Sequence, residues 1–284
     1  MLTLRSASLT VLAMLAFAGN SLLCRAALTD TAIDPASFTT IRLVSGALVL
    51  WLIVNARRGS HAGRGSWPSA MALFVYAAGF SFAYVSLTAA TGALLLFGAV
   101  QATMIGHGLW AGERLGRMQI VGLALALAGL VALLLPGLSA PPLAGSILMI
   151  GAGIAWGVYS LRGKGAGDPI RVTAGNFLRA APIALLVTVF TLRDASPDAA
   201  GVAYAIASGA IASGVGYAVW YRALPALKAT QAATVQLGVP GLAASGGVVL
   251  LGETITLGFL AASLAILAGI LMVILEKRTK SRIR

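Results

Sequence analysis

Side chains that could do covalent or metal chemistry are few in this sequence. Of the two histidines, His107 lies in an apolar stretch and His61 in a basic loop, and the single cysteine, Cys24, excludes an intrachain disulfide. A metal cluster needs more ligands than these. A serine hydrolase would need a serine held beside His107, and no motif supplies that arrangement. The sequence therefore predicts no catalytic residue, no metal site and no cofactor.

The polar groups that remain are amides and hydroxyls near the middle of apolar stretches, with aromatic rings at a similar depth. Such polar groups are costly away from water unless they face a cavity or each other. A pocket with apolar walls and a few amide or hydroxyl groups suits an uncharged or zwitterionic small molecule with an apolar side chain. For each aromatic residue alone, packing against lipid or the protein core is the alternative. The residues predicted to bind this molecule are Phe17, Asn20, Tyr76, Phe80, Gln101, Trp156, Tyr159, Tyr217, Gln236 and Ser245.

Five further residues are predicted to have a gating or structural function. Arg42 and Arg179 lie roughly 10 to 14 Å inside their stretches at 1.5 Å per helical residue. They either tether helix ends through carbonyl groups, with the guanidinium reaching an interface, or attract a substrate carboxylate at a cavity mouth. Pro240, flanked by Gly238, marks either a hinge or a static kink. Gly98 belongs to a row of small residues that allows helices to approach closely.

The elements that must position these groups are membrane helices. Of the 284 residues, 59% are hydrophobic and only 10% are charged, far below the roughly 25% charged residues of soluble domains. A helical bundle is favoured over a barrel, whose strands would alternate apolar and polar side chains. The first stretch lacks a small-residue cleavage site, so we expect it to be retained. Ten stretches are long enough to span a membrane: 8–29, 35–56, 67–88, 91–112, 116–135, 143–163, 170–192, 199–223, 229–251 and 255–275.

The basic residues fix the expected orientation. If the N-terminus is inside, most of the 20 Lys and Arg residues fall in segments on the cytoplasmic side, including Arg57, Arg114 and the C-terminal tail. Both termini are therefore expected to be cytoplasmic, in a bacterial-type inner membrane. The formal net charge of +12 then indicates a basic girdle against anionic lipids rather than a nucleic-acid partner.

The chain contains a weak internal repeat. Displacing the sequence along itself by about 140 residues places Gly98 on Gly238 and Gly112-Glu113 on Gly252-Glu253. Five stretches per half is an odd number, so the second half would enter the membrane inverted. We therefore predict an all-α membrane protein with two inverted five-helix repeats, residues 1–138 and 139–284, the second carrying the basic cytoplasmic tail. Inverted repeats are typical of transporters with alternating access.

Further matching positions point to a family. Trp156-Gly157, the arginines of the second helix in each half, the segment 226–230 and the Gly-Glu joints before the last helix of each half resemble the drug/metabolite transporter superfamily, in particular its EamA-like family. That resemblance covers nearly the whole chain. It implies a ten-helix transporter similar to exporters of amino acids and related metabolites, the aromatic amino-acid exporter among them.

We therefore expect an exporter of small neutral or zwitterionic metabolites, with amino acids, including aromatic and hydrophobic ones, as the foremost class. No Asp or Glu lies in the middle of a stretch and His107 is the one intramembrane group that titrates near neutrality, so the sequence predicts a carrier without obligatory coupling. The alternatives are a multidrug or other metabolite exporter with proton coupling and, more remotely, a channel or an intramembrane serine hydrolase. The oligomeric state stays open, a monomer being one interpretation.

Overall fold

The computed structural model describes most of the chain. Glu113, which the repeat comparison used, lies outside the described part. The described residues are 4–57, 63–112, 115–134, 140–163, 166–191, 193, 195–196, 198–227 and 235–280.

The described residues form helices and connecting turns, without a strand. Eight helical segments are long and apolar enough to cross a membrane, and α11 is a shorter apolar helix, so this is a multi-pass membrane protein whose helices fit the ten predicted stretches. The elements are α1 (Leu4–Asp30), α2 (Pro35–Ala56), α3 (Trp67–Tyr84), α4 (Ala89–Trp110), α5 (Arg117–Leu134), α6 (Leu143–Gly163), α7 (Pro169–Phe190), α8 (Ala199–Ile206), η2 (Ala207–Val215), α9 (Gly216–Ala223), η3 (Leu224–Ala226), α11 (Gly238–Leu251) and α12 (Leu257–Lys280).

Aspartates set where several helices begin. Asp34 accepts hydrogen bonds from the backbone N–H groups of Ala36 and Ser37 and so caps α2, whose first residue is a proline. Asp168 caps α7 in the same way, and Asp198 caps α8. Because an Asp side chain satisfies N–H groups that have no partner within the helix, these positions are the sharpest helix starts in the sequence.

The sequence predicts a helix break at Gly92, near the start of the stretch 91–112, because glycine is common in turns. This prediction was wrong. Thr88 accepts a hydrogen bond from the backbone N–H of Thr91 and caps α4, so α4 begins at Ala89 and α3 ends at Tyr84. Gly92 lies inside α4, where a Cβ would overlap the ring of Tyr84. This glycine serves close packing of a buried aromatic ring against a helix backbone and does not form a turn.

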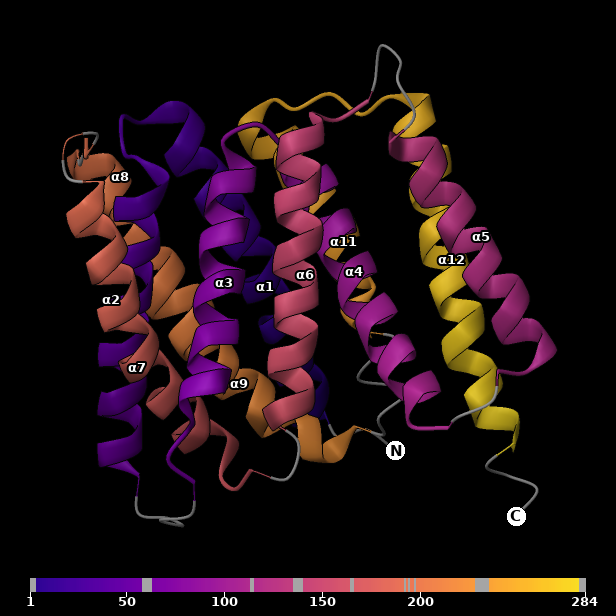
Figure 1. Ribbon diagram of the computed structural model, residues 1–284, viewed down its shortest axis with the longest axis horizontal. Coiled ribbons are helices and arrows are strands. Elements are labelled where there is room, and N and C mark those ends of the chain that lie inside the picture. The colour runs from indigo at the N-terminus through magenta and orange to yellow at the C-terminus, as the bar shows by residue number, and fades with distance from the viewer. Residues whose placement is uncertain are drawn as a thin grey trace.

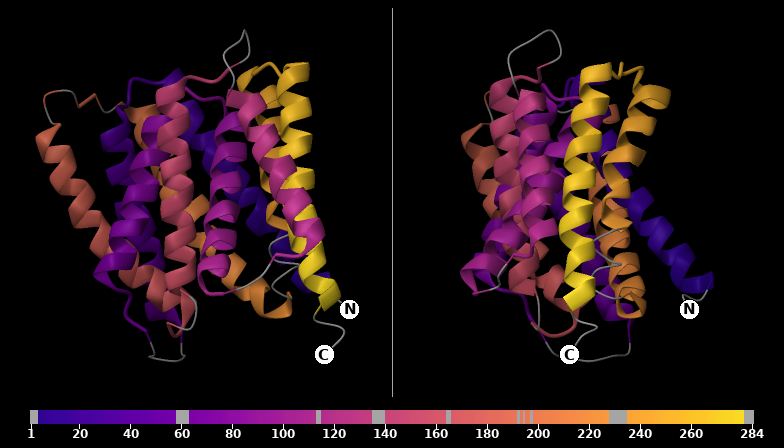
Figure 2. Two further views of the ribbon diagram at one scale, coloured as in Figure 1. Left: turned by 45° about the vertical axis from the view of Figure 1, so that its right-hand side comes forward. Right: turned by 90° about the vertical axis from the view of Figure 1, so that its right-hand side faces the viewer.

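The helices pack as one bundle with an attached pair (Figure 1). The pair is α5 and α12, which cross so closely that a Cβ on Gly122 or Gly269 would meet the carbonyl of the other glycine. In the rest of the bundle, α6 packs on α3 and α4, α2 packs on α7, and α1 packs on α8, η2, α9 and α11. The beginning of α1 and the end of α12 lie at the same end of the bundle in both views of Figure 2.

The helix from 199 to 223 is not a uniform α-helix as the sequence predicts. Its middle, η2, is a π-helix, in which hydrogen bonds join residues five apart. The sequence of this segment repeats a Ser-Gly pair at that spacing, as Ser208-Gly209 and Ser213-Gly214. A Cβ on Gly209 would overlap the backbone carbonyl of Arg42, so the π-helix lies directly against α2.

Candidate functional site

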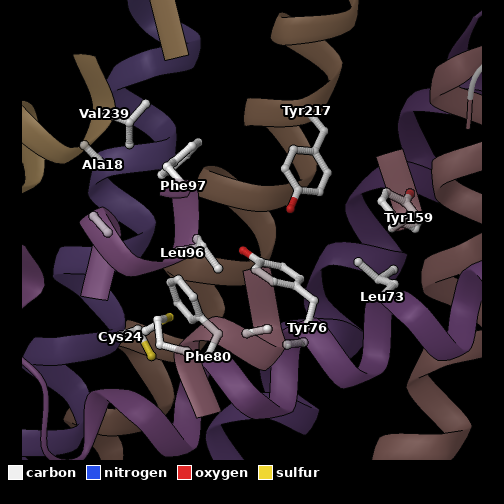
Figure 3. Close-up of a cluster of buried hydrophobic side chains, with 14 of the residues drawn as sticks. Ala18, Cys24, Leu73, Tyr76, Phe80, Leu96, Phe97, Tyr159, Tyr217 and Val239 are labelled. Atoms are coloured by element: carbon white, nitrogen blue, oxygen red, sulfur yellow. The ribbon is translucent and has the colours of Figure 1, made fainter. Parts of the chain in front are cut away.

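Aromatic rings from four helices meet around Tyr76. The ring of Trp156 on α6 lies with its centroid 4.7 Å from that of Tyr76 and 5.3 Å from that of Tyr217 on α9. Phe17 on α1 contacts Tyr217 edge-on at 5.9 Å. In Figure 3, Tyr217 extends from its helix toward Tyr76, hydroxyl end first. Edge and tilted contacts of this kind are favourable and hold the rings in fixed positions.

These rings enclose a small cavity of about 30 Å³ between the N-terminal and C-terminal halves of the chain. This is about the volume that one water molecule occupies, so side chains must move before a metabolite can enter. The cavity brings together most of the residues predicted to bind substrate, namely Phe17, Asn20, Tyr76, Phe80, Trp156, Tyr217 and Gln236.

Arg42 lies directly behind this wall. Its side chain is 1% exposed, and its Nη2 donates to the Tyr76 hydroxyl at 3.0 Å while its Nε donates to Ser213 Oγ at 3.4 Å. The guanidinium carbon also lies 4.8 Å from the centroid of the Phe80 ring, at cation–π distance. The buried guanidinium of Arg42, with side-chain hydroxyls as partners, does not show the carbonyl contacts that the tethering interpretation expects.

No carboxylate balances the charge of Arg42 in the described part of the chain. The ion pairs there are Arg25–Glu253 and Arg57–Asp168, at 3.4 and 3.5 Å. Arg42 Nη1 is buried and has no hydrogen-bond partner among the described residues. A buried cation without an anion is costly, and such a group in a membrane protein is a candidate functional residue.

Arg179, the predicted counterpart of Arg42, lies in a different environment. Its Nη1 donates to the carbonyls of Arg64 and Gly175 at 2.6 and 2.8 Å, which ties α7 to the segment before α3. This is the carbonyl pattern that the tethering interpretation expects. The two arginines are thus equivalent in sequence position but not in their contacts.

The π-helix supplies polar groups that the sequence analysis did not include in the site. Ser208 donates to Asn20 Oδ1 at 2.7 Å, and Ser213 accepts from Arg42. In an α-helix, residues five apart point about 140° away from each other, whereas the wider turn of a π-helix brings them closer to the same face. The Ser-Gly repeat at a spacing of five was the available signal. The same segment gives Ser213 and Ala212 to the cavity wall.

Three other predicted binding residues, and Gly98 of the gating or structural group, lie elsewhere. Gln101 and Gly98 line a larger, almost wholly apolar cavity of about 370 Å³ between α4, α5, α6 and α12. Tyr159 lies behind Trp156, its hydroxyl 3.4 Å from both Thr173 and Asn176. Ser245 is exposed and bonds to the carbonyl of its own helix. These four residues do not line the aromatic cavity, which has more of the polar groups that a metabolite needs.

The two remaining predicted residues lie at the start of α11. The helix begins at Gly238, so Pro240 is in its first turn, and a turn at Leu237 interrupts the helical backbone that precedes it. Pro240 has no N–H to offer the carbonyl four residues earlier, which explains an interruption at this point. A Cβ on Gly238 would meet no atom of the described residues within 4 Å, so no close helix contact is seen at this glycine in that part of the chain.

A multi-pass helical protein with a polar and aromatic cavity between its two halves has the architecture of a membrane transporter. A model of the EamA-like transporter family matches residues 4–135 and again residues 143–275. The chain belongs to this family, which lies within the drug/metabolite transporter superfamily.

Known proteins resemble the chain to different extents. It is 59% identical over 271 residues to an uncharacterized protein of Pseudomonas aeruginosa, which covers 95% of this chain and 94% of that protein. It is 34% identical over 148 residues to the threonine/homoserine exporter RhtA of Escherichia coli, an alignment of 50% of this chain and 49% of the exporter. A solved crystal structure aligns with 96% of this chain over 98% of the chain in that structure, with a TM-score of 0.67 and 20% sequence identity. At this identity the match shows a similar fold and nothing more.

Proposed function

We propose that this protein exports small zwitterionic metabolites, amino acids including aromatic and hydrophobic ones foremost, across a bacterial inner membrane. The observation that carries the proposal is the buried cavity in which Tyr76, Trp156 and Tyr217 surround a few amide and hydroxyl groups. Such a wall binds an apolar side chain through its rings and a polar backbone through its hydrogen bonds. The name of the distant relative RhtA, a threonine/homoserine exporter, agrees with this substrate class.

The mechanism we propose is alternating access by two inverted five-helix repeats with both termini cytoplasmic. Two observations support it. One family model matches each half of the chain separately. The helix contacts are also reciprocal, because the first helix of each half packs on the third and fourth helical segments of the other half. Thus α1 contacts the segment from α8 to α9 and also α11, and α6 contacts α3 and α4. A pseudo-two-fold relation between the halves produces this exchange of partners, and it places the cavity between them.

Transport in this proposal needs no obligatory proton or sodium coupling. The polar groups around the cavity are hydroxyls, amides and one arginine, and no Asp or Glu lines it among the described residues. A hydrolase would need a serine beside His107, and Ser45, Ser213 and Ser245, each of which precedes a glycine, have other partners. Ser213 accepts from Arg42, whereas Ser245 and Ser45 donate to helix carbonyls. In this proposal the basic cytoplasmic segments lie against anionic lipids.

Counterflow in proteoliposomes tests the proposal. Liposomes loaded with unlabelled threonine or phenylalanine should accumulate the labelled amino acid, with saturation and without an imposed pH gradient. A strict requirement for that gradient would favour the proton-coupled alternative, and ionic conductance without counterflow would favour a channel. Absence of counterflow across a panel of amino acids, alongside transport of cationic drugs, would reject the amino-acid proposal.

A further inference from the structure

Two hydroxyls on the cavity wall are aligned by the same guanidinium. The Tyr76 hydroxyl oxygen accepts from Arg42 Nη2 at 3.0 Å and from Asn20 Nδ2 at 3.5 Å. The Ser213 hydroxyl oxygen accepts from Arg42 Nε at 3.4 Å. Both residues line the cavity, whereas Arg42 stands behind them. The positive charge is thus one hydrogen bond away from the space that a ligand would occupy.

The hydroxyl protons of these two residues are free to point into the cavity. A tyrosine oxygen that already accepts two hydrogen bonds can use its O–H only to donate. Neither Tyr76 nor Ser213 donates to an acceptor in the described part of the chain, and the Tyr217 hydroxyl on the opposite wall has no hydrogen bond there. The wall around Arg42 therefore favours donation over acceptance, since the Tyr76 oxygen already accepts two hydrogen bonds and the hydroxyls of Ser213 and Tyr217 can also donate.

Asn20 does not reverse this balance. Its Oδ1 already accepts from Ser208 at 2.7 Å, which turns its Nδ2 toward Tyr76. Donors backed by a cation, without a carboxylate among the described residues, favour an anionic oxygen over a neutral or cationic group, since charge-assisted hydrogen bonds are the stronger ones.

We propose that this cavity binds the carboxylate of the transported molecule through the hydroxyls of Tyr76 and Ser213, with Arg42 as the positioning residue that orients both hydroxyls and supplies the opposite charge. This inference rests on the proposed export function and names the chemical group that the cavity selects. The faces of Trp156 and Tyr217 then remain for the ammonium group or an apolar side chain, since a cation is attracted to such rings.

The proposal differs from attraction at a cavity mouth. Arg42 is 1% exposed, so its charge acts only on a molecule that is already inside the bundle. Such a carboxylate also serves as the missing counter-ion of Arg42. The loaded site is therefore less costly to bury than the empty one, which favours movement of the loaded carrier.

The test compares amino acids with their amides on the full-length protein. Thermal unfolding in detergent is measured with L-threonine and L-phenylalanine and with the corresponding amides, and each compound also competes in counterflow. We expect the acids to act at concentrations roughly tenfold or more below the amides, the ratio that one charged hydrogen bond supplies. Tyr76→Phe, Ser213→Ala and Arg42→Gln should reduce this ratio toward one.

Tyr84→Phe is the matched control. It also removes one buried tyrosine hydroxyl from α3, but that hydroxyl bonds to the carbonyl of Ala89 at 3.4 Å, and Tyr84 is not among the residues that line the cavity. The control should keep the preference for acids. If Arg42→Gln fails to fold, the preference for acids over amides in Tyr76→Phe and Ser213→Ala still tests the carboxylate site.

Two outcomes separate this inference from the proposed function. Counterflow of amino acids without any preference over amides, or a preference that survives Tyr76→Phe and Ser213→Ala, would overturn the carboxylate site and leave the export function standing. Acid-selective thermal stabilisation that depends on Tyr76, in a protein that shows no counterflow, would support the site and reject export.

Discussion

Glu253 lies between α11 and α12 and contacts both α1 and the start of α4. Its removal should therefore lower the free energy of unfolding by a predictable amount. Its two carboxylate oxygens accept hydrogen bonds from the backbone N–H of Ala89 at 2.9 and 3.0 Å, at the first turn of α4. One of them also lies 3.4 Å from Arg25 Nε on α1. The side chains of Arg25 and Glu253 are 19% and 9% exposed, so solvent screens the pair only in part.

We expect Glu253→Ala to destabilise the protein by about 2 kcal/mol. A lost helix cap costs about 1 kcal/mol, a lost negative charge at a helix N-terminus about 0.3 to 1 kcal/mol, and a partly screened ion pair about 0.2 to 1 kcal/mol. For a chain of this size that corresponds to a fall in Tm of roughly 4 to 8 °C. Glu253→Gln keeps a hydrogen-bond acceptor for Ala89 and should show about half the fall.

Thermal unfolding of the detergent-solubilised protein measures the change. A double-mutant cycle with Arg25→Gln isolates the ion pair, and we expect a coupling of at least about 0.5 kcal/mol because the groups are in contact. A Tm within 1 °C of wild type in Glu253→Ala, or the full loss in Glu253→Gln, would refute this account of the helix cap.

Three other perturbations test separate parts of the structure. Hydrogen bonds from Ser37, Ser196 and Ala36 outweigh partial burial and hold the pKa of Asp34 below its usual 3.8, so this group stabilises the fold above that pH and the stabilisation is lost as pH falls below it. Tm should therefore stay constant from pH 7 to 5 and fall below about pH 4, and the fall should be smaller in Asp34→Asn than in the wild type. An equal fall in the wild type and in Asp34→Asn would contradict this role of Asp34. Gly122→Leu should lower Tm by roughly 5 °C or more, because even a Cβ there meets the Gly269 carbonyl, whereas Gly258→Ala, with open space, should change Tm little; equal effects would contradict the close crossing. Pro240→Ala should slow counterflow several-fold at unchanged Tm if the turn at Leu237 is a hinge, and unchanged counterflow would identify a static kink.

The helices were predictable because two strong signals coincide in this chain. Uninterrupted apolar length predicts a membrane span, and Asp-Pro pairs such as Asp34-Pro35 and Asp168-Pro169 mark where the next helix begins. The errors occur where a residue type has two uses. Gly92 could form a turn or admit a ring, and only the position of Tyr84 decides between them.

The candidate site was predictable in depth along the helices but not in direction around them. Phe17, Asn20 and Gln101 were chosen because they lie near the middle of their stretches, yet Gln101 lies on a different cavity. A membrane helix that is apolar on all sides carries no amphipathic pattern, so its sequence does not tell which side faces a neighbouring helix. The π-helix adds a second obstacle, because it rotates every residue that follows it.

Arg42 and Arg179 show why a repeat predicts positions better than environments. An arginine lies on the second helix of each half, but each side chain contacts the opposite half: Arg42 meets Ser213 of the C-terminal half, and Arg179 meets the Arg64 carbonyl of the N-terminal half. In any one conformation of a carrier with alternating access, the two halves differ, since one side of the cavity must be closed while the other can open. Unequal surroundings for two equivalent arginines are what this mechanism requires. On the proposed function, the contacts of Arg179 therefore belong to one conformation and should weaken when the cavity opens to the other side, a change that cross-linking between the Arg64 segment and α7 can detect.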